Sequence, residues 1–276
     1  MAAQFAIPAA VGFGVADFAG GLATRRGCYP LWIITVAQLA GTAVLLPVLL
    51  LWPGRPSAAA VGLGAVAGLA GSSGLLLYFR GLAHGPMGMV APLSALAGAG
   101  LPLVVGVAAG EHPGPVTLSG VAVALVAIAL ATIGTSHDRA AAGGLLLGIG
   151  SGVGFGLFYV ALNATSPGSG LWPLLAAKVA AVVVFGSLVL ARRTPGAALW
   201  ARPGLVVLSG TADMMSNMLF LLATRTGTLS VSAVLVSLYP VVVVILARFV
   251  LHERLTLLQA TSVTFALTAG ALLSSG

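Results

Sequence analysis

Charged residues are scarce in this 276-residue chain: they make up 6% of the sequence, against 59% for hydrophobic residues. A soluble domain needs roughly a quarter of its residues to be ionic in order to cover its surface. The deficit excludes a soluble globular protein. It predicts an integral membrane protein, which we expect in the cell (inner) membrane of a prokaryote.

Other absences narrow the function. The single cysteine, Cys28, excludes an intramolecular disulfide and a cysteine-cluster metal site. The net charge of +7 comes from basic residues scattered at the ends of apolar runs, without the aromatic-basic patch of a nucleic-acid-binding protein. There is no phosphate-binding loop and no His-Glu-x-x-His motif.

We therefore expect no cofactor, no bound metal and no nucleic-acid partner. The expected partners are membrane lipid and a small-molecule substrate. The sequence leaves the oligomeric state open, and a monomer is compatible with it.

Long apolar runs dominate what remains. A spanning helix needs about 20 mostly apolar residues, and continuous rather than alternating runs argue against a β-barrel. The predicted fold class is all-α, a polytopic membrane protein with ten transmembrane helices. Charged, Pro-rich and Gly-rich breaks place them at 4–23, 31–52, 58–79, 86–109, 114–134, 143–164, 171–191, 203–223, 228–250 and 255–275.

The chain repeats itself at an offset of 142 residues, with no gap needed in the comparison. The matches include Val11-Gly12-Phe13-Gly14 with Val153-Gly154-Phe155-Gly156, Pro53-Gly54 with Pro195-Gly196, Gly68 with Gly210, and Glu111 with Glu253. The repeat predicts an N-terminal five-helix unit at 1–134, a polar link at 135–142 and a C-terminal five-helix unit at 143–276. Because five is odd, the second unit must enter the membrane inverted. Inverted repeats of this kind build secondary transporters.

Short motifs resemble a known family. Each half has a glutamate between its fourth and fifth helices, and the second half carries Pro240, Glu253, Arg254, Leu255, Gln259 and Gly270 in the order of a "Pro … (G/D)-E-R-L … Q … G" pattern. The chain thereby resembles the ten-helix EamA-type members of the drug/metabolite transporter superfamily. The first half departs from the pattern, with Gly98 and Thr117 at the proline and glutamine positions. The resemblance implies export or exchange of small metabolites, amino acids or drugs without ATP hydrolysis.

Two carboxylates lie at membrane depth, Asp17 in the first helix and Asp213 in the eighth. Such residues are expensive in the bilayer and usually face a cavity or pathway. A carboxylate that exchanges a proton for a cationic substrate is a minimal antiporter, so both are predicted to couple transport to protons. The alternative is an aspartate that only holds two helices together.

Helical spacing supplies the neighbours of these carboxylates, because residues four apart share a face. Phe13 is expected beside Asp17, Phe155 beside Tyr159, and Asn217 beside Asp213. An aromatic face with a carboxylate suits an ammonium group, although the same aromatic residues serve equally as packing.

Three further features complete the predicted machinery. Lys178 lies too deep in the seventh helix to reach the interface, so it is predicted to bind a substrate carboxylate or to neutralise Asp213. Tyr78 is a weaker substrate-binding candidate. Pro92 and Pro102 are predicted to interrupt the fourth helix, and Pro240 the ninth.

A membrane enzyme is the competing hypothesis. The tetrad "GSSG" at 71–74 matches the Gly-x-Ser-Gly of rhomboid-type intramembrane serine proteases, with Ser73 as nucleophile. That chemistry needs a histidine at membrane depth, but His84, His112, His137 and His252 lie at segment ends or in links. The sequence therefore favours a transporter, not an enzyme: a proton-coupled exporter or exchanger that works by alternating access between its two halves.

Overall fold

The structure is a computed structural model that describes residues 2–52, 54–84, 87–132, 140–196 and 202–251, and residues 257–258, 261, 264–265, 268–269 and 271–272 beyond these. Within them every element is helical. Seven helices are long and apolar enough to cross a membrane, and two shorter apolar helices accompany them. The prediction of an all-α membrane protein is confirmed at this level.

The helices follow the predicted segments closely for the first nine. They are α1 Ala3–Arg25, α2 Pro30–Leu51, α3 Ala58–His84, α4 Met87–Ala108, α5 Pro115–Thr132, α6 Ala140–Asn163, α7 Trp172–Ala191, α9 Pro203–Thr226, α10 Leu229–Val236 and α11 Tyr239–Val250, with a 3₁₀ turn at Pro167–Ser169. Most of the tenth predicted segment, 255–275, lies outside the described residues, as do residues 133–134 of the N-terminal unit and residues 135–139 of the polar link. The motif residues Glu253, Arg254, Leu255, Gln259 and Gly270 also lie outside them.

The prolines act differently in the fourth and ninth segments. The ninth is split into α10 and α11 by a turn at Ser237 and Leu238, directly before Pro240, as predicted. The prediction for the fourth segment is wrong: α4 runs through Pro92 and Pro102 without a break. A proline removes one helical hydrogen bond, and neighbouring helices can satisfy the freed carbonyl inside a membrane bundle.

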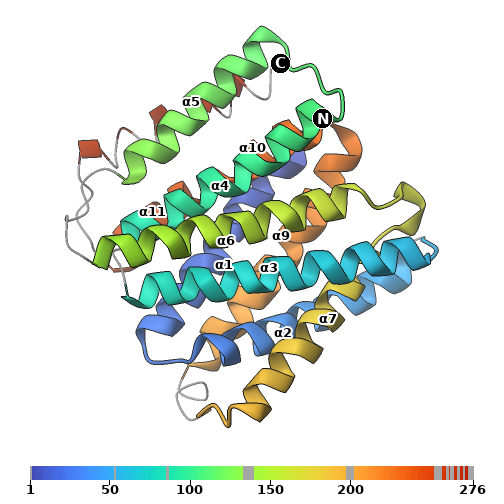
Figure 1. Cartoon of the computed structure of the whole chain (residues 1–276), viewed down its shortest axis with the longest axis vertical. Helices are drawn as coiled ribbons and strands as arrows, with labels where there is room; N and C mark the ends of the chain where they lie inside the picture. Colours follow the sequence, from blue (N-terminus) through green and yellow to red (C-terminus); the bar gives the residue numbers. More distant parts are fainter. Residues whose placement is uncertain are drawn as a thin grey trace.

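The two halves interlock. Figure 1 shows α3 and α6 running side by side, α5 at one edge of the bundle, and α2 and α7 at the opposite edge. Helix α1 packs on α9 as α6 packs on α3, and α2 packs on α9 as α7 packs on α3. Likewise α1 contacts α10 and α11 while α6 contacts α4. Exchanging the halves therefore reproduces these largest helix contacts among the described residues.

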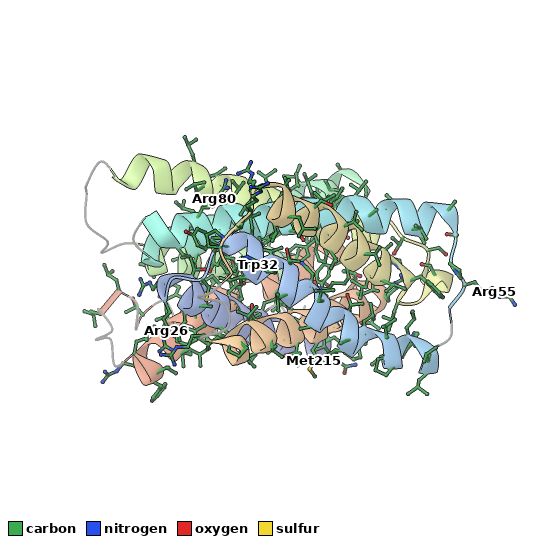
Figure 2. The ribbon with its side chains drawn as sticks, turned by 90° about the horizontal axis from the view of Figure 1, so that it is seen from below. Arg26, Trp32, Arg55, Arg80 and Met215 are labelled. Atoms are coloured by element: carbon green, nitrogen blue, oxygen red, sulfur yellow. The ribbon has the colours of Figure 1, made fainter. Side chains whose placement is uncertain are left out.

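The outer surface of the bundle suits lipid. Large apolar side chains point outward along its length, such as Leu50 (87% exposed) and Leu190 (77% exposed). Met215 projects from α9 away from the bundle, and Arg26 and Arg55 lie at its opposite ends (Figure 2). Lipid tails solvate apolar side chains as well as a protein core does. Apolar side chains can therefore face outward, and the interior of the bundle can hold polar residues.

Glycines from the repeat make equivalent contacts in both halves. Gly12 of α1 lies against Ala212 of α9, and Gly154 of α6 lies against Ala70 of α3. Each of these residues is 142 positions from its counterpart. The shared "VGFG" block is thus explained by close helix crossing, which small residues permit.

The second helix of each half follows a different offset. A Cβ on Gly210 would overlap the backbone of Ala37 in α2, and a Cβ on Gly68 would overlap the backbone of Ala177 in α7. Ala37 and Ala177 are 140 residues apart, whereas the two glycines are 142 apart. The prediction of a gapless repeat is therefore wrong for α2 and α7, where the correspondence shifts by two residues.

Two equivalent tryptophans, Trp32 and Trp172, are also 140 residues apart. The Trp32 indole N–H donates to the Thr194 carbonyl (2.9 Å), and the Trp172 indole N–H donates to the Gly54 carbonyl (3.2 Å). Each bond ties the start of a second helix to the loop that follows the second helix of the other half. The offset of 140 also aligns the two Leu-Trp pairs, at 31–32 and 171–172.

Candidate functional site

A cavity of about 60 Å³ lies between the halves. It is lined by α1, α2 and α3 of the first half and by α6, α7, α9 and α11 of the second. A cavity of this size holds a few water molecules or a small ligand. Of the predicted site residues, those that line it are Phe13, Asp17, Phe155, Tyr159, Lys178, Asp213 and Asn217.

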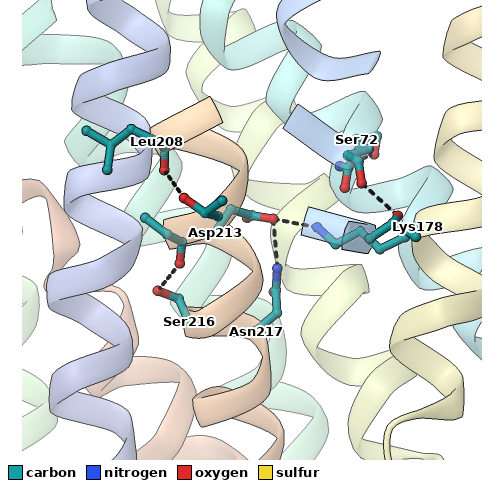
Figure 3. A network of polar contacts seen from close by, with 10 residues as sticks. Ser72, Lys178, Leu208, Asp213, Ser216 and Asn217 are labelled. Atoms are coloured by element: carbon teal, nitrogen blue, oxygen red, sulfur yellow. Dashed lines mark hydrogen bonds and ion pairs between the residues drawn. The ribbon is translucent and has the colours of Figure 1, made fainter. Parts of the chain in front are cut away.

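An ion pair crosses the cavity wall from α7 to α9. The ammonium of Lys178 lies 2.6 Å from a carboxylate oxygen of Asp213, and the Asn217 amide donates to that same oxygen at 2.9 Å (Figure 3). The Lys178 side chain is 5% exposed and that of Asp213 is 27% exposed. Of the two roles predicted for Lys178, the structure selects neutralisation of Asp213.

Asp17 of α1 is the other carboxyl group in the wall. Its residue is 8% exposed, and it forms no ion pair with any residue that the structure describes. Asp17 and Asp213 line the same cavity. The fully buried hydroxyl of Tyr78 lies next to Asp17 but forms no hydrogen bond of good geometry.

Tyr78 is the one predicted site residue that does not line the cavity. Its ring packs against those of Phe79 and Phe155, with centroids 5.9 and 6.1 Å away. It therefore supports the wall from behind, beside Asp17.

Aromatic rings close the site between α1, α6 and α9. Phe13 meets Tyr159 edge to face at 6.4 Å, and Tyr159 also packs against Phe158 at 5.7 Å and Phe220 at 4.4 Å. The predicted juxtaposition of the Phe13–Asp17 face with the Phe155–Tyr159 face is present, since all four residues line one cavity.

Sequence reasoning missed several wall residues. Gln38 of α2 donates from its amide to the Ser72 hydroxyl of α3 at 3.0 Å, and both line the cavity together with Phe158 and Tyr239. Each left a signal: Gln38 is an amide inside an apolar run, Ser72 belongs to the "GSSG" tetrad, and Tyr239 precedes Pro240. With the offset of 140, Gln38 is also the counterpart of Lys178.

The charges of the site do not balance. The described residues of the wall contain two carboxyl groups and one ammonium. A site with one surplus carboxylate, shielded from water, is stable only when a proton or another cation neutralises it. The arrangement can therefore hold a proton or a small cation at Asp17, one in place of the other.

Comparison with known proteins identifies the fold alone. No family model matches the chain, and no curated protein matches it. A solved crystal structure, 17% identical in sequence, superposes with a TM-score of 0.72 over 97% of this chain and 98% of that one. It is one of 29 solved chains with a significant structural match. The resemblance of this chain to the ten-helix transporter family is therefore supported by the sequence motifs alone.

Proposed function

We propose that this protein is a proton-coupled secondary transporter, an exporter or exchanger of small amine-bearing metabolites, amino acids or cationic drugs. The observation that carries the proposal is the cavity between the halves, in which Asp17 has no counter-ion among the residues that the structure describes, while Asp213 is paired with Lys178. Proton and substrate compete for Asp17, so the release of one accompanies the binding of the other. Asp213 contributes to coupling through its repulsion of Asp17.

Alternating access follows from the way the halves interlock. We propose ten helices in two inverted five-helix repeats, with a tenth helix at 255–275. The equivalent contacts of α1 with α9 and of α6 with α3 support this arrangement. In such folds the two repeats exchange conformations around a fixed central site. We propose that the break before Pro240 is a movable joint, because α11 reaches the cavity there through Tyr239.

The sequence motifs favour the same function. The resemblance to EamA-type drug/metabolite transporters implies transport without ATP hydrolysis, and the structural match supplies a fold compatible with it. We propose membership of that superfamily and a place in the inner membrane of a prokaryote.

The test is reconstitution in vesicles with an acidic interior. Radiolabelled n-butylammonium, norvaline and tetramethylammonium serve as probes, and uptake is counted above that of empty vesicles. We expect at least one probe to accumulate in wild-type vesicles and to lose its pH-driven accumulation in Asp17→Asn. Asparagine has nearly the shape of aspartate but does not ionise, so we expect the variant to fold and to lose proton coupling.

A matched control removes a carboxylate outside the cavity. Glu111→Gln changes a residue between α4 and α5 and is expected to keep the pH-driven uptake. Unchanged coupling in Asp17→Asn would remove Asp17 from the mechanism, and no uptake of any probe would contradict the transporter proposal.

No observation favours the serine-protease hypothesis. Ser73 is exposed on α3, whereas its neighbour Ser72 is the serine that faces the cavity. His112, at the turn after α4, is the one histidine whose side chain the structure describes, and it is exposed there.

A further inference from the structure

The cavity wall presents hydrogen-bond acceptors that have nothing to accept. The amide oxygens of Gln38 and Asn217 are buried, and neither has a hydrogen-bond partner. Both residues are at least nine-tenths buried, at 8% and 3% exposed, and both line the cavity with Asp17. A buried carbonyl oxygen without a partner is costly, so each one calls for a donor.

By contrast, the nitrogen atom of each of these side chains already has a hydrogen-bond partner. The Lys178 ammonium and the Asn217 amide N–H both serve Asp213, and the Gln38 amide N–H serves Ser72. The orientation of Asn217 follows from chemistry, because a carboxylate oxygen only accepts and must face the amide nitrogen. Among the described cavity-lining residues, the buried side-chain atoms left with no partner at all are the amide oxygens of Gln38 and Asn217, and both are acceptors.

We propose that the cavity selects a small primary ammonium cation, which donates its N–H groups to the Asp17 carboxylate and to the amide oxygens of Gln38 and Asn217. This inference rests on the proposed transport function and names its substrate class. A primary ammonium carries three donors and one positive charge, which matches three acceptor groups and one surplus carboxylate. A quaternary ammonium has the charge but no donor.

An amino-acid zwitterion fits less well. Its carboxylate needs a cation, and Lys178 is the cation among the described residues of the wall. Lys178 already lies 2.6 Å from Asp213, so a substrate carboxylate would have to displace that residue. The cavity volume of about 60 Å³ also sets a small size for the ligand. The alkyl part of a small amine lies against the rings of Phe13 and Tyr159.

The aromatic rings of the cavity support a competing prediction, a preference for quaternary over primary ammonium ions. Recognition by aromatic faces alone binds quaternary ammonium ions well. Recognition by acceptors requires N–H donors. The two modes are separated by n-butylammonium and tetramethylammonium, which are isomers with the same charge and the same atoms.

Equilibrium binding to the purified protein in detergent measures this directly, by calorimetry without any ion gradient. We expect n-butylammonium to bind at least tenfold more tightly than tetramethylammonium, since each lost hydrogen bond to a charged group is worth about tenfold or more. Norvaline, which is n-butylammonium with a carboxylate on the carbon next to nitrogen, is expected to bind at least tenfold more weakly. Equal or tighter binding of tetramethylammonium would overturn the proposal, as would tighter binding of norvaline.

Variants assign the selectivity to its residues. Gln38→Leu and Asn217→Leu keep side-chain volume but remove an acceptor, so the preference for n-butylammonium is expected to fall severalfold in each. Asn163→Leu, at the exposed end of α6, is the matched control and is expected to keep it. An unchanged preference in both cavity variants would overturn the assignment. If a variant does not fold, the three ligands on the wild-type protein still decide.

The binding test and the transport test fail separately. Selective binding of n-butylammonium without uptake in vesicles would support the site and contradict the transporter. Uptake of tetramethylammonium that matches or exceeds that of n-butylammonium would support the transporter and contradict the proposed selectivity.

Discussion

The two halves share their packing and differ in their chemistry. Gly68 and Gly210 meet a second helix of the opposite half in the same way. At the cavity, by contrast, the counterpart of Asp17 is Tyr159, and Lys178 corresponds to Gln38 at the shifted offset.

The difference separates two demands on the chain. Close helix contacts depend on small residues at crossing points, and both halves satisfy them with the same glycines. The proposed coupling uses one surplus carboxylate in the described wall, whereas a symmetric pair of halves would carry a carboxylate at both equivalent positions. One half therefore holds the unpaired carboxylate and the other holds the ion pair of Lys178 and Asp213.

The shared packing is tested by adding a methyl group at the crossing glycines. A Cβ at Gly68 or Gly210 would overlap backbone atoms, which cannot rotate away as a side chain would. We expect Gly68→Ala and Gly210→Ala each to lower the stability by about 3 kcal/mol. Thermal unfolding in detergent measures the loss.

A second pair from the repeat is the control. Gly62 and Gly204 have no atom within 4 Å of an added Cβ. Gly62→Ala and Gly204→Ala are expected to change stability by about 0.5 kcal/mol or less. If all four variants unfolded at the same temperature, close crossing would not be the reason for the glycines.

The chemical difference is tested by making the halves alike at one position. Lys178→Gln places the residue of Gln38 in α7 and leaves Asp213 without a counter-charge. We expect a loss of about 2 kcal/mol, between the values for exposed and buried ion pairs, because the Asp213 side chain is 27% exposed. Adding Asp213→Asn removes the unpaired charge and is expected to recover most of the loss. A double variant less stable than Lys178→Gln would contradict the role of the ion pair.

A smaller effect is expected where α10 begins. The Glu111 carboxylate accepts from the backbone N–H groups of Leu229 (2.8 Å) and Ser230 (3.1 Å) and caps the helix. Glu111→Gln keeps one acceptor and loses the charge, for an expected loss of about 1 kcal/mol in thermal unfolding. Glu253 is the counterpart of Glu111 in the second half. An equal loss of stability in Glu253→Gln would indicate that both glutamates have the same role. No loss in Glu111→Gln would contradict the cap.

The smallest effect is expected at two outward-facing counterparts. Ser73 of α3 and Met215 of α9 are 142 residues apart, and both are exposed. Ser73→Ala is expected to change stability by less than about 0.5 kcal/mol and to leave uptake unchanged. We also expect no labelling of Ser73 by a serine-reactive probe. Labelling that disappears in Ser73→Ala would revive the enzyme hypothesis.

Features that depend on local spacing could be predicted from the sequence. Nine helical segments follow from apolar runs, and the bond between Asp213 and Asn217 follows from residues four apart on one helix. The break before Pro240 also follows from a local rule, although the same rule fails at Pro102, where α4 continues. A proline removes one helical hydrogen bond, but the packing of neighbouring helices determines whether the helix breaks at that position.

Features that depend on the register between helices could not be predicted. Lys178 had two possible partners, and only the way in which α7 and α9 both pack on α2 brings it to Asp213. The two-residue shift of α2 and α7 is hidden because the offset of 142 holds on both sides of these helices, at the two Val-Gly-Phe-Gly blocks before them and at Gly68 and Gly210 after them. That shift concealed the correspondence of Gln38 with Lys178, and with it the place of Gln38 in the cavity.

The indole hydrogen bonds of Trp32 and Trp172 allow the fluorescence of these two residues to report on conformational change. Trp32, at the start of α2, bonds to Thr194 after α7, and Trp172, at the start of α7, bonds to Gly54 beside Arg55, which lies at the opposite end of the bundle from Arg26 (Figure 2). Indole fluorescence responds to the loss of a hydrogen bond and to entry of water. With Trp52 and Trp200 replaced by phenylalanine, a chain that keeps one of the two remaining tryptophans emits from one face of the membrane. Opposite changes in the emission of the two single-tryptophan proteins would reveal which face opens when ligand is added.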